Sequence, residues 1–367
     1  MTQVAQYLLG LSLGVIWLPL QGCLPSTTTP PPPTPTLTEE RIDALEQPDS
    51  TSASPETKPL TISPELPIPV PVTKPWKIAY VLKTLNDPYW LRVGQAAQEI
   101  GKELSVQVQI VGPENPPNSE FVEEQIVLIS NLLDQEDLDG IVVGPADSIR
   151  LVPIIEKAIA TGIKVIALDT PVGSEEISTF VGFDNFLAGK SVGQWVVGRL
   201  GGSGNVLILE GPKHHDNAIE RQRGFLAGLS TGKIRILASQ SANWNLEEAQ
   251  ILTAQWLAQY PEIDAIMAAN DNMALGAVAA IEAGNHTNIL VSGFDGSEAG
   301  LAAIQAQQLE ATIDQPPEEQ SRIAMQLMIH QLENNTPLAS EFILKNSQII
   351  NLKNSPPLTI KNKDQTK

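Results

Sequence analysis

The sequence predicts an α/β protein with two Rossmann-like lobes, each built on a parallel β-sheet. From residue 76 onward, short apolar runs alternate with longer amphipathic stretches, which is the order of strands and helices in parallel α/β folds. Ten such apolar runs are too many for one small sheet. Polar residues follow several of them, and open parallel sheets bind ligands at the carboxyl ends of their strands. We therefore expect one cleft shared by two lobes.

The chain begins with a stretch typical of an export signal. Residues 8–20 are mostly apolar, about as long as a signal-peptide core and too short to span a bilayer comfortably. The stretch ends at Gly22 and Cys23, and it resembles the lipobox of bacterial lipoproteins, whose cysteine is lipidated and becomes the mature N-terminus. Gln21 departs from that pattern, as does the lack of Lys or Arg before Leu8. We therefore predict a lipoprotein signal peptide at residues 1–22. The alternative is an uncleaved or non-lipidated signal with an incidental cysteine.

Residues 23–75 are predicted to be the lipidated cysteine and a Pro/Thr-rich tether. The segment is rich in Pro, Thr, Ser and Glu, and frequent Pro prevents regular strand pairing. Few large apolar side chains are present to offset the entropy lost on ordering. We expect a semi-extended connection between the lipid and the folded part.

The folded part is predicted element by element from residue 77 to residue 334. Gly162 and Gly284 follow predicted helices, where a C-terminal cap is expected, and Asn245 with Glu248 resembles a capping box. The predicted strands are 77–82, 106–111, 139–143, 163–168, 179–182, 205–209, 234–239, 264–268, 288–293 and 309–313. The predicted helices are 88–104, 119–135, 150–161, 185–200, 216–230, 245–259, 271–283, 297–306 and 317–334.

Composition and missing motifs exclude several function classes. The chain has 42 acidic and 23 basic residues and a formal net charge of -19, so it repels nucleic-acid phosphates and is not expected to bind them. The single cysteine excludes an internal disulfide and a Cys-based zinc site. No Gly-rich phosphate loop follows a strand, so we expect no nucleotide cofactor. His214 and His215 are adjacent and should point apart, so we expect no metal site.

Four corners of the predicted fold resemble a known family. Residues 76–352 are similar to the bacterial periplasmic sugar-binding proteins of the ribose/allose branch, which have the type I periplasmic-binding-protein fold. The segments that carry the resemblance are Leu82-Lys83-Thr84-Leu85-Asn86-Asp87-Pro88-Tyr89-Trp90, Ile166-Ala167-Leu168-Asp169, Ala269-Asn270-Asp271-Asn272-Met273-Ala274-Leu275-Gly276 and Gly293-Phe294-Asp295-Gly296.

The resemblance implies two lobes joined by a hinge of three crossing strands. The first lobe would comprise residues 76–183 and 316–344. The second would comprise residues 184–315 and 345–355, followed by a tail at 356–367. The crossings would fall near Phe183, Gln315 and Leu344.

The resemblance also implies which residues contact the ligand. The family's aromatic pair matches Tyr89 and Trp90, and its third aromatic residue matches Trp244. Aromatic rings suit the C–H-rich faces of a sugar, whose hydroxyls then point to polar groups. For all three aromatic residues, core packing is the alternative. The family's polar ligands match Asp169, Arg221, Asn270, Asp295 and Gln315.

Two of these polar residues carry alternatives of their own. Asp169 could instead be a helix cap. Arg221 is favoured over the neighbouring Arg223 by its register in the motif, and its planar fork can donate two hydrogen bonds. Replacing Arg221 or Trp244 by alanine is expected to weaken binding by about 2–4 kcal/mol with little loss of folding.

Three further residues of the expected site bear on which sugar is bound. Lys83, Trp90 and Trp244 look like the allose-binding pattern. Asp87 stands where the family has asparagine, and Thr170 where ribose binders have arginine. A carboxylate at position 87 can only accept hydrogen bonds, so Lys83 and Asp87 form an ion pair or the ligand carries an extra donor.

By this resemblance we expect a monomeric, lipid-anchored, extracytoplasmic capture subunit of an ABC importer. Its partners would be a monosaccharide and a membrane permease. The alternative is a sensory protein that presents a sugar or furanose-like signal to a receptor. Asp87, Asp169 and Asp295 could in principle form a glycosidase pair, but their mixture with Asn, Gln and Arg favours binding over catalysis.

Overall fold

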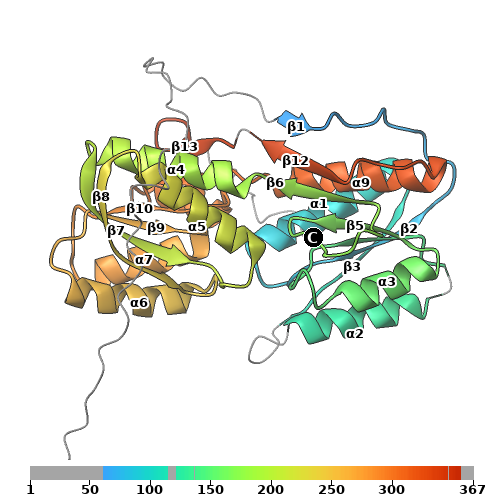
Figure 1. The fold of residues 1–367 in the computed structure, drawn as a ribbon, viewed down its shortest axis with the longest axis horizontal. Coiled ribbons are helices and arrows are strands. Elements are labelled where there is room, and N and C mark those ends of the chain that lie inside the picture. Colours follow the sequence, from blue (N-terminus) through green and yellow to red (C-terminus); the bar gives the residue numbers. More distant parts are fainter. Residues whose placement is uncertain (1–60, 115–120, 136, 346, 357–367) are drawn as a thin grey trace, which may run out of the picture. The chain divides into compact units, whose positions relative to one another are not determined.

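The computed structural model describes residues 61–114, 121–135, 137–345 and 347–356 (Figure 1). Their strands form two sheets. The first contains β1 (Thr61–Ser63), β2 (Lys77–Val81), β3 (Gln107–Val111), β4 (Gly140–Val143), β5 (Lys164–Leu168), β6 (Thr179–Phe183) and β12 (Glu341–Lys345). The second contains β7 (Ser203–Glu210), β8 (Lys233–Ser241), β9 (Ala265–Ala268), β10 (Leu290–Ser292), β11 (Ala311–Ile313) and β13 (Ile349–Asn351).

The two sheets repeat one topology. The first sheet has the order β1-β12-β6-β5-β4-β2-β3 and the second β13-β11-β10-β9-β7-β8. All neighbouring pairs are parallel except β1 with β12 and β13 with β11. The core of each sheet, β3-β2-β4-β5-β6 and β8-β7-β9-β10-β11, follows the doubly wound order 2-1-3-4-5. Such sheets bind ligands at the carboxyl edge beside the point where the strand order reverses.

Helices cover both faces of the first sheet. α1 (Pro88–Leu104) packs with α9 (Pro317–Asn334) on one face, and α2 (Phe121–Leu133) packs with α3 (Val152–Ala160) on the other. The side chains of β2 show why both faces of the sheet are covered by helices. Ile78 and Tyr80 belong to the core on the α1/α9 side, while Ala79 and Val81 belong to the core on the α2/α3 side. Because side chains alternate along a strand, a run that is apolar at every position is buried on both faces.

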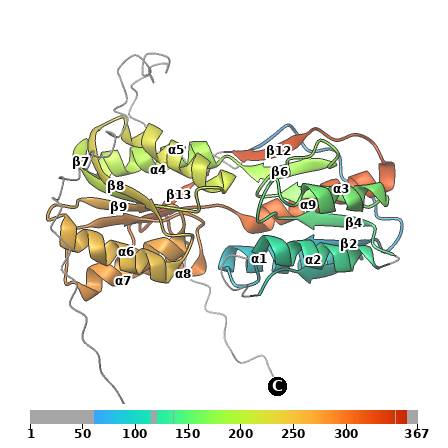
Figure 2. The same cartoon turned by 60° about the horizontal axis from the view of Figure 1, so that its bottom comes forward.

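The second sheet is covered in the same way (Figure 2). α4 (Asn185–Arg199) and α5 (Asp216–Leu229) pack against each other on one side. The other side carries α6 (Leu246–Gln259), α7 (Asp271–Ala283) and α8 (Glu298–Gln305). We call each sheet with its helices the first lobe and the second lobe. The chain passes from the first sheet to the second after β6, returns after β11 and passes over again after β12.

The fold class is as the sequence predicts. Each of the ten predicted strands and nine predicted helices is present, and no end differs by more than two residues. β1, β12 and β13 were not predicted. The predicted signal peptide, Cys23 and most of the tether lie outside the described residues, as do residues 357–367 of the tail. Among the described residues, no helix combines the length and apolarity needed to cross a membrane.

The prediction of a semi-extended tether is wrong for residues 61–75, which pair with and pack on the first lobe. β1 pairs antiparallel with β12, and Ile62 and Val72 pack against the core. Further along, Glu333 on α9 accepts hydrogen bonds from the backbone N–H of Thr73 at 2.7 Å and from its hydroxyl at 2.7 Å. The indole Nε1 of Trp76 donates to the same carboxylate at 2.6 Å. Because Glu333 lies about 260 positions from Thr73 and Trp76 in the sequence, local composition does not reveal these contacts.

Candidate functional site

The corner between β2 and α1 carries the first group of predicted site residues. Asp87 is the N-cap of α1, and its carboxylate accepts from the backbone N–H of Tyr89 at 2.9 Å. Pro88 follows in the first turn, where its fixed φ suits a helix start. This capped start places Tyr89 and Trp90 side by side in the helix, with their rings edge to face and 5.3 Å apart.

Each of the two predicted tryptophans packs against a glycine at the carboxyl end of a neighbouring strand. Trp90 lies against Gly144 directly after β4, and Trp244, in the loop after β8, lies against Gly211 directly after β7. A Cβ atom at either glycine would overlap the indole ring. Trp244 has a left-handed backbone with φ of 61°, which costs roughly 1–2 kcal/mol outside glycine. Strained backbone of this kind clusters at ligand sites.

Asp169 is a meeting point of the two lobes. It follows β5 with φ of 65° and is buried. One oxygen accepts from Gln315 Nε2 at 2.9 Å and from the Tyr89 hydroxyl at 3.3 Å. The other accepts from Asn217 Nδ2 at 2.8 Å. It is therefore held by side chains of three separate segments and does not act as a helix cap.

Lys83 pairs with Asp169 and Thr170 instead of Asp87. Its Nζ atom donates to the Thr170 hydroxyl at 2.9 Å and lies 3.8 Å from Asp169 Oδ2. Asp87 receives instead a hydrogen bond from Asn272 Nδ2 at 3.2 Å. Of the two alternatives drawn from the sequence, the Lys83–Asp87 ion pair is not formed, because the β5 corner brings a closer carboxylate.

Arg221 is buried and joins four groups. Nε donates to Asn185 Oδ1 at 2.8 Å, and Nη1 donates to Ala269 O at 2.7 Å and Asp295 Oδ1 at 3.1 Å. Nη2 donates to Gln315 Oε1 at 2.6 Å. The guanidinium carbon lies 3.8 Å from the centre of the Phe294 ring. Arg223, the alternative, is largely exposed and pairs with Glu220 on the same helix.

Asn270 and Asp295 complete the set from the second lobe. Asn270 follows β9 and caps α7, where it accepts from the backbone N–H of Met273 at 2.9 Å. Its amide group donates to the carbonyl of Trp244 at 3.4 Å. Asp295 follows β10 with φ of 109°. The structure thus brings the predicted residues together at the carboxyl ends of the strands of both sheets.

Burial shifts the protonation equilibria of the cluster. It lowers the pKa of Lys83 and raises the pKa of Asp87. Burial also raises the pKa of Tyr89 well above its usual value, and the neighbouring Asp169 adds to this. For Asp295, burial raises the pKa well above its usual value, and the guanidinium of Arg221 opposes this shift.

Three neighbours of the site were not predicted as site residues. Asn217 precedes Arg221 by four positions on α5, and that spacing places both on one face of the helix. Asn272 follows Asn270 on α7 and reaches Asp87. His215 accepts from Trp244 Nε1 at 3.0 Å, and burial lowers its pKa to about 2.

The expectation that His214 and His215 point apart is wrong. Their rings meet edge to face, 4.6 Å between centres, because His215 is the N-cap of α5 and lies in extended backbone after a turn. The directions of both side chains are therefore set by a loop, where the alternation along a strand or helix does not apply.

The cluster can bind a small neutral molecule rich in hydroxyl groups. It offers amide groups that both donate and accept, carboxylates that accept, a guanidinium that donates, and two indole rings. In this conformation the groups bond to one another, and the cavity beside Asp87, Asn272 and Asp295 measures about 10 Å³. A sugar needs far more room than this cavity offers.

Comparisons with known proteins agree with this geometry. The periplasmic binding protein domain family matches residues 78–336. The D-ribose/D-allose-binding protein of Pseudomonas aeruginosa is 30% identical over 268 residues, which cover 71% of this chain and 83% of that protein. The D-allose-binding periplasmic protein of Escherichia coli is 30% identical over 261 residues, 68% of this chain and 83% of that protein.

Solved structures give the same result. The crystal structure of an ABC transporter periplasmic solute binding protein from Actinobacillus succinogenes with bound D-allose matches with a TM-score of 0.71 and 33% identity, over 76% of this chain and 99% of that one. The Caulobacter myo-inositol binding protein, bound to myo-inositol, matches with a TM-score of 0.69 and 25% identity, over 78% of this chain and 96% of that one. The chain therefore belongs to the type I periplasmic sugar-binding proteins, in the ribose/allose branch.

Proposed function

We propose that this protein is the sugar-capturing subunit of an ABC importer and binds one monosaccharide between its two lobes. The observation that carries the proposal is the hydrogen-bonded chain Arg221–Gln315–Asp169, which joins the second lobe, the connection after β11 and the first lobe. The proposed ligand residues are Lys83, Asp87, Tyr89, Trp90, Asp169, Thr170, Arg221, Trp244, Asn270, Asp295 and Gln315.

Binding would follow from a change of hydrogen-bond partners. When the lobes separate, groups such as Asp169 and Gln315 lose their mutual bonds and face the open cleft. Sugar hydroxyls would then take the place of these partners, with a ring face against Trp90 or Trp244. Because the contacts come from both lobes, the ligand binds the closed form more tightly and shifts the population toward it. The closed form would be the one that the permease accepts.

The pair Lys83 and Asp87 bears on the identity of the sugar. The Lys83 ammonium donates beside Asp169, and the Asp87 carboxylate only accepts. A ligand that accepts at the first position and donates at the second fits both. Hexoses of the allose type and amino sugars are therefore the first candidates.

A thermal-shift panel of pentoses, hexoses, sugar alcohols and amino sugars tests the proposed function. A ligand present at 100 times its Kd stabilises the folded state by about 2.7 kcal/mol. One or a few monosaccharides should raise the midpoint, and the same sugars should be recovered chemically unchanged after incubation. No shift with any sugar would contradict capture, and release of a product would contradict binding without catalysis.

We propose further that Cys23 carries a lipid anchor, because the only cysteine of the chain directly follows Gly22 at the end of the apolar run. More than one acyl chain is needed for durable anchoring to a membrane. Cys23→Ser should release the protein from the membrane fraction, and unchanged fractionation would contradict the anchor. We also propose that the protein is a monomer, which light scattering of the detergent-solubilised chain tests directly.

A further inference from the structure

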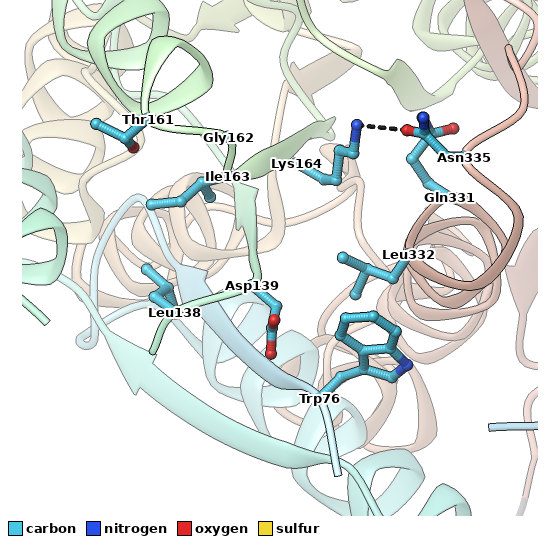
Figure 3. A pocket seen from close by; sticks show the side chains of 10 residues that line it. All are labelled: Trp76, Leu138, Asp139, Thr161, Gly162, Ile163, Lys164, Gln331, Leu332 and Asn335. Atoms are coloured by element: carbon cyan, nitrogen blue, oxygen red, sulfur yellow. Dashed lines mark hydrogen bonds between the residues drawn. The ribbon is translucent and has the colours of Figure 1, made fainter. Parts of the chain in front are cut away.

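A cavity of about 300 Å³ lies away from the sugar cleft (Figure 3). Trp76 and Asp139, which line it, directly precede β2 and β4, whereas the residues of the cleft follow the ends of their strands. Both charged side chains of its lining are engaged: Lys164 Nζ donates to Asn335 Oδ1 at 2.7 Å, and Asp139 pairs with Lys74 Nζ at 3.1 Å. The groups that can orient a ligand lie instead at the carboxyl ends of the strands.

One of these groups is His215, which contacts the indole ring of Trp244 in the proposed sugar cleft. The indole Nε1 donates to His215 Nδ1 at 3.0 Å, and the two rings are tilted by 32° with their centres 6.4 Å apart. His215 lies in the loop between β7 and α5, and Trp244 lies in the loop after β8. Both loops follow the carboxyl ends of parallel strands, the edge at which open sheets bind ligands.

Trp244 is carried by a strained loop. Trp244 and the preceding Asn243 both have left-handed backbone, with φ of 61° and 53°, which residues other than glycine adopt only at a cost. Such conformations persist where the surrounding contacts determine them. Gly211 supports the six-membered ring of the indole, and the guanidinium carbon of Arg221 lies 5.4 Å from its ring centre. The bond to His215 fixes the remaining edge of the indole, which carries the N–H group.

The side chain of His215 serves Trp244 and not its own helix. His215 is the N-cap of α5, a position where the side chain of Ser, Thr, Asp or Asn usually accepts from a backbone N–H of the first turn. Asp87 at α1 and Asn270 at α7 accept such a bond, whereas the side chain of His215 makes none. A residue whose only role was to begin α5 would cap that helix. The bond to Trp244 therefore indicates a role in the cleft.

The surroundings of His215 keep its ring neutral. Burial, the ammonium group of Lys83 and the neighbouring His214 lower the pKa of His215 to about 2. A neutral imidazole that accepts at Nδ1 carries its proton on Nε2. Nδ1 is therefore an acceptor for the indole N–H at neutral pH, which a protonated ring could not be.

We infer that His215 is a positioning residue of the sugar cleft, whose Nδ1 atom orients Trp244 so that the indole presents a ring face, and not its N–H group, to the sugar. The inference rests on the proposed function of the cleft. Because the indole N–H is already bonded to His215, it is not a donor for a sugar hydroxyl. Trp244 then recognises the C–H-rich face of a pyranose or furanose and leaves the hydroxyls to the amide, carboxylate and guanidinium groups.

A double-mutant cycle on the full chain tests this role, with binding of D-allose and D-ribose measured by calorimetry. His215→Leu should weaken binding about tenfold, the equivalent of one hydrogen bond. Trp244→Phe keeps an aromatic ring without the N–H, and in that background His215→Leu should cost no further affinity, because residues that act through one contact are not additive. His286→Leu, at an exposed histidine after α7, is the matched control and should bind as the unmodified chain does.

Proton–nitrogen NMR of the indole N–H groups gives a readout that needs no sugar. The chain has six tryptophans, and the signal that is missing in Trp244→Phe belongs to Trp244. In His215→Leu this signal should shift and its exchange with water should accelerate. His215→Asn keeps an acceptor bonded to Cγ, as Nδ1 is, so it should keep both the Trp244 signal and the sugar affinity close to those of the unmodified chain.

Three results would overturn the inference. These are affinity losses of His215→Leu and Trp244→Phe that simply add, a loss in His215→Asn as large as that in His215→Leu, and an unchanged Trp244 N–H signal in His215→Leu. If the proposed cleft function fails instead, neither sugar gives heat with any of the chains, while the Trp244 N–H signal still moves in His215→Leu. The two failures are therefore distinguishable.

Discussion

Replacing Arg221 by alanine should destabilise the folded protein as well as abolish sugar binding. The guanidinium makes four hydrogen bonds and covers Phe294, and only 4% of the residue is exposed. Its removal leaves the Asp295 carboxylate buried without its cation. Breaking a buried ion pair from one side costs about 3–5 kcal/mol. The expectation of little loss of folding, drawn from the sequence, therefore does not fit the structure.

A double variant separates the cost of leaving the Asp295 carboxylate unpaired from the cost of losing the packing contacts of Arg221. Asp295→Asn in the Arg221→Ala background removes the carboxylate that burial disfavours. The double variant should be more stable than Arg221→Ala alone. Its loss should therefore be smaller than the sum of the two single losses by at least about 1 kcal/mol, within the usual range of coupling energies between residues in contact. Urea unfolding of the unmodified chain, both single variants and the double variant at pH 7 measures this coupling.

The coupling experiment has clear contrary results. If Arg221→Ala loses less than about 1 kcal/mol, the guanidinium is not part of a tightly buried network. If the losses of the two single variants simply add, Asp295 does not depend on Arg221. Arg223→Ala is the matched control on the same helix and should change stability by no more than about 0.5 kcal/mol, as exposed substitutions usually do.

Three further predictions concern single groups. Burial raises the pKa of Asp271 from 3.8 to about 6, so the folded state binds this proton more tightly than the unfolded chain. Asp271 should therefore contribute up to about 3 kcal/mol to the free energy of unfolding below pH 4, and this contribution is lost as the pH rises through 6. Asp271→Asn should remove this pH dependence of the free energy of unfolding measured in urea. Lys83→Met removes a charged donor and should weaken binding of the best sugar about tenfold in calorimetry. Unchanged affinity would exclude contact between Lys83 and the sugar. Glu333→Gln weakens the three hydrogen bonds from Thr73 and Trp76, so amide exchange at Thr73 should accelerate while sugar affinity stays unchanged. Equal exchange rates in the variant and the unmodified chain would show that Glu333 does not hold Thr73.

The sequence predicts most of the fold because its signals are local. The alternation of apolar runs and amphipathic stretches sets β2 to β11 and α1 to α9 within two residues at each end. β1 has three residues and one large apolar side chain, Ile62, and its order comes from pairing with β12. Such short strands at the ends of sheets depend on distant partners, and no periodicity marks them.

The site is predictable where a motif fixes it and less so where two lobes meet. Asp169 directly follows β5 and Asp295 lies three positions after the end of β10, so their place at the sheet edge follows from topology. The partner of Lys83 depends instead on how the β2 and β5 corners approach, which the sequence does not encode locally. Asn217 could have been found from its four-residue spacing to Arg221. Asn272 could not, because its partner Asp87 belongs to the other lobe.

Sugar capture by the cleft is tested most directly by calorimetric titration of the full chain with D-allose, D-ribose and the best sugar of the thermal panel. We expect saturable binding of one sugar per chain at the cleft, with loss of about 2–4 kcal/mol of binding free energy in Trp244→Ala. Trp195→Ala, a partly buried tryptophan of α4 away from the cleft residues, should bind as the unmodified chain does. Equal affinity in the Trp244→Ala and unmodified chains, or no heat with any of these sugars, would contradict sugar capture by the cleft.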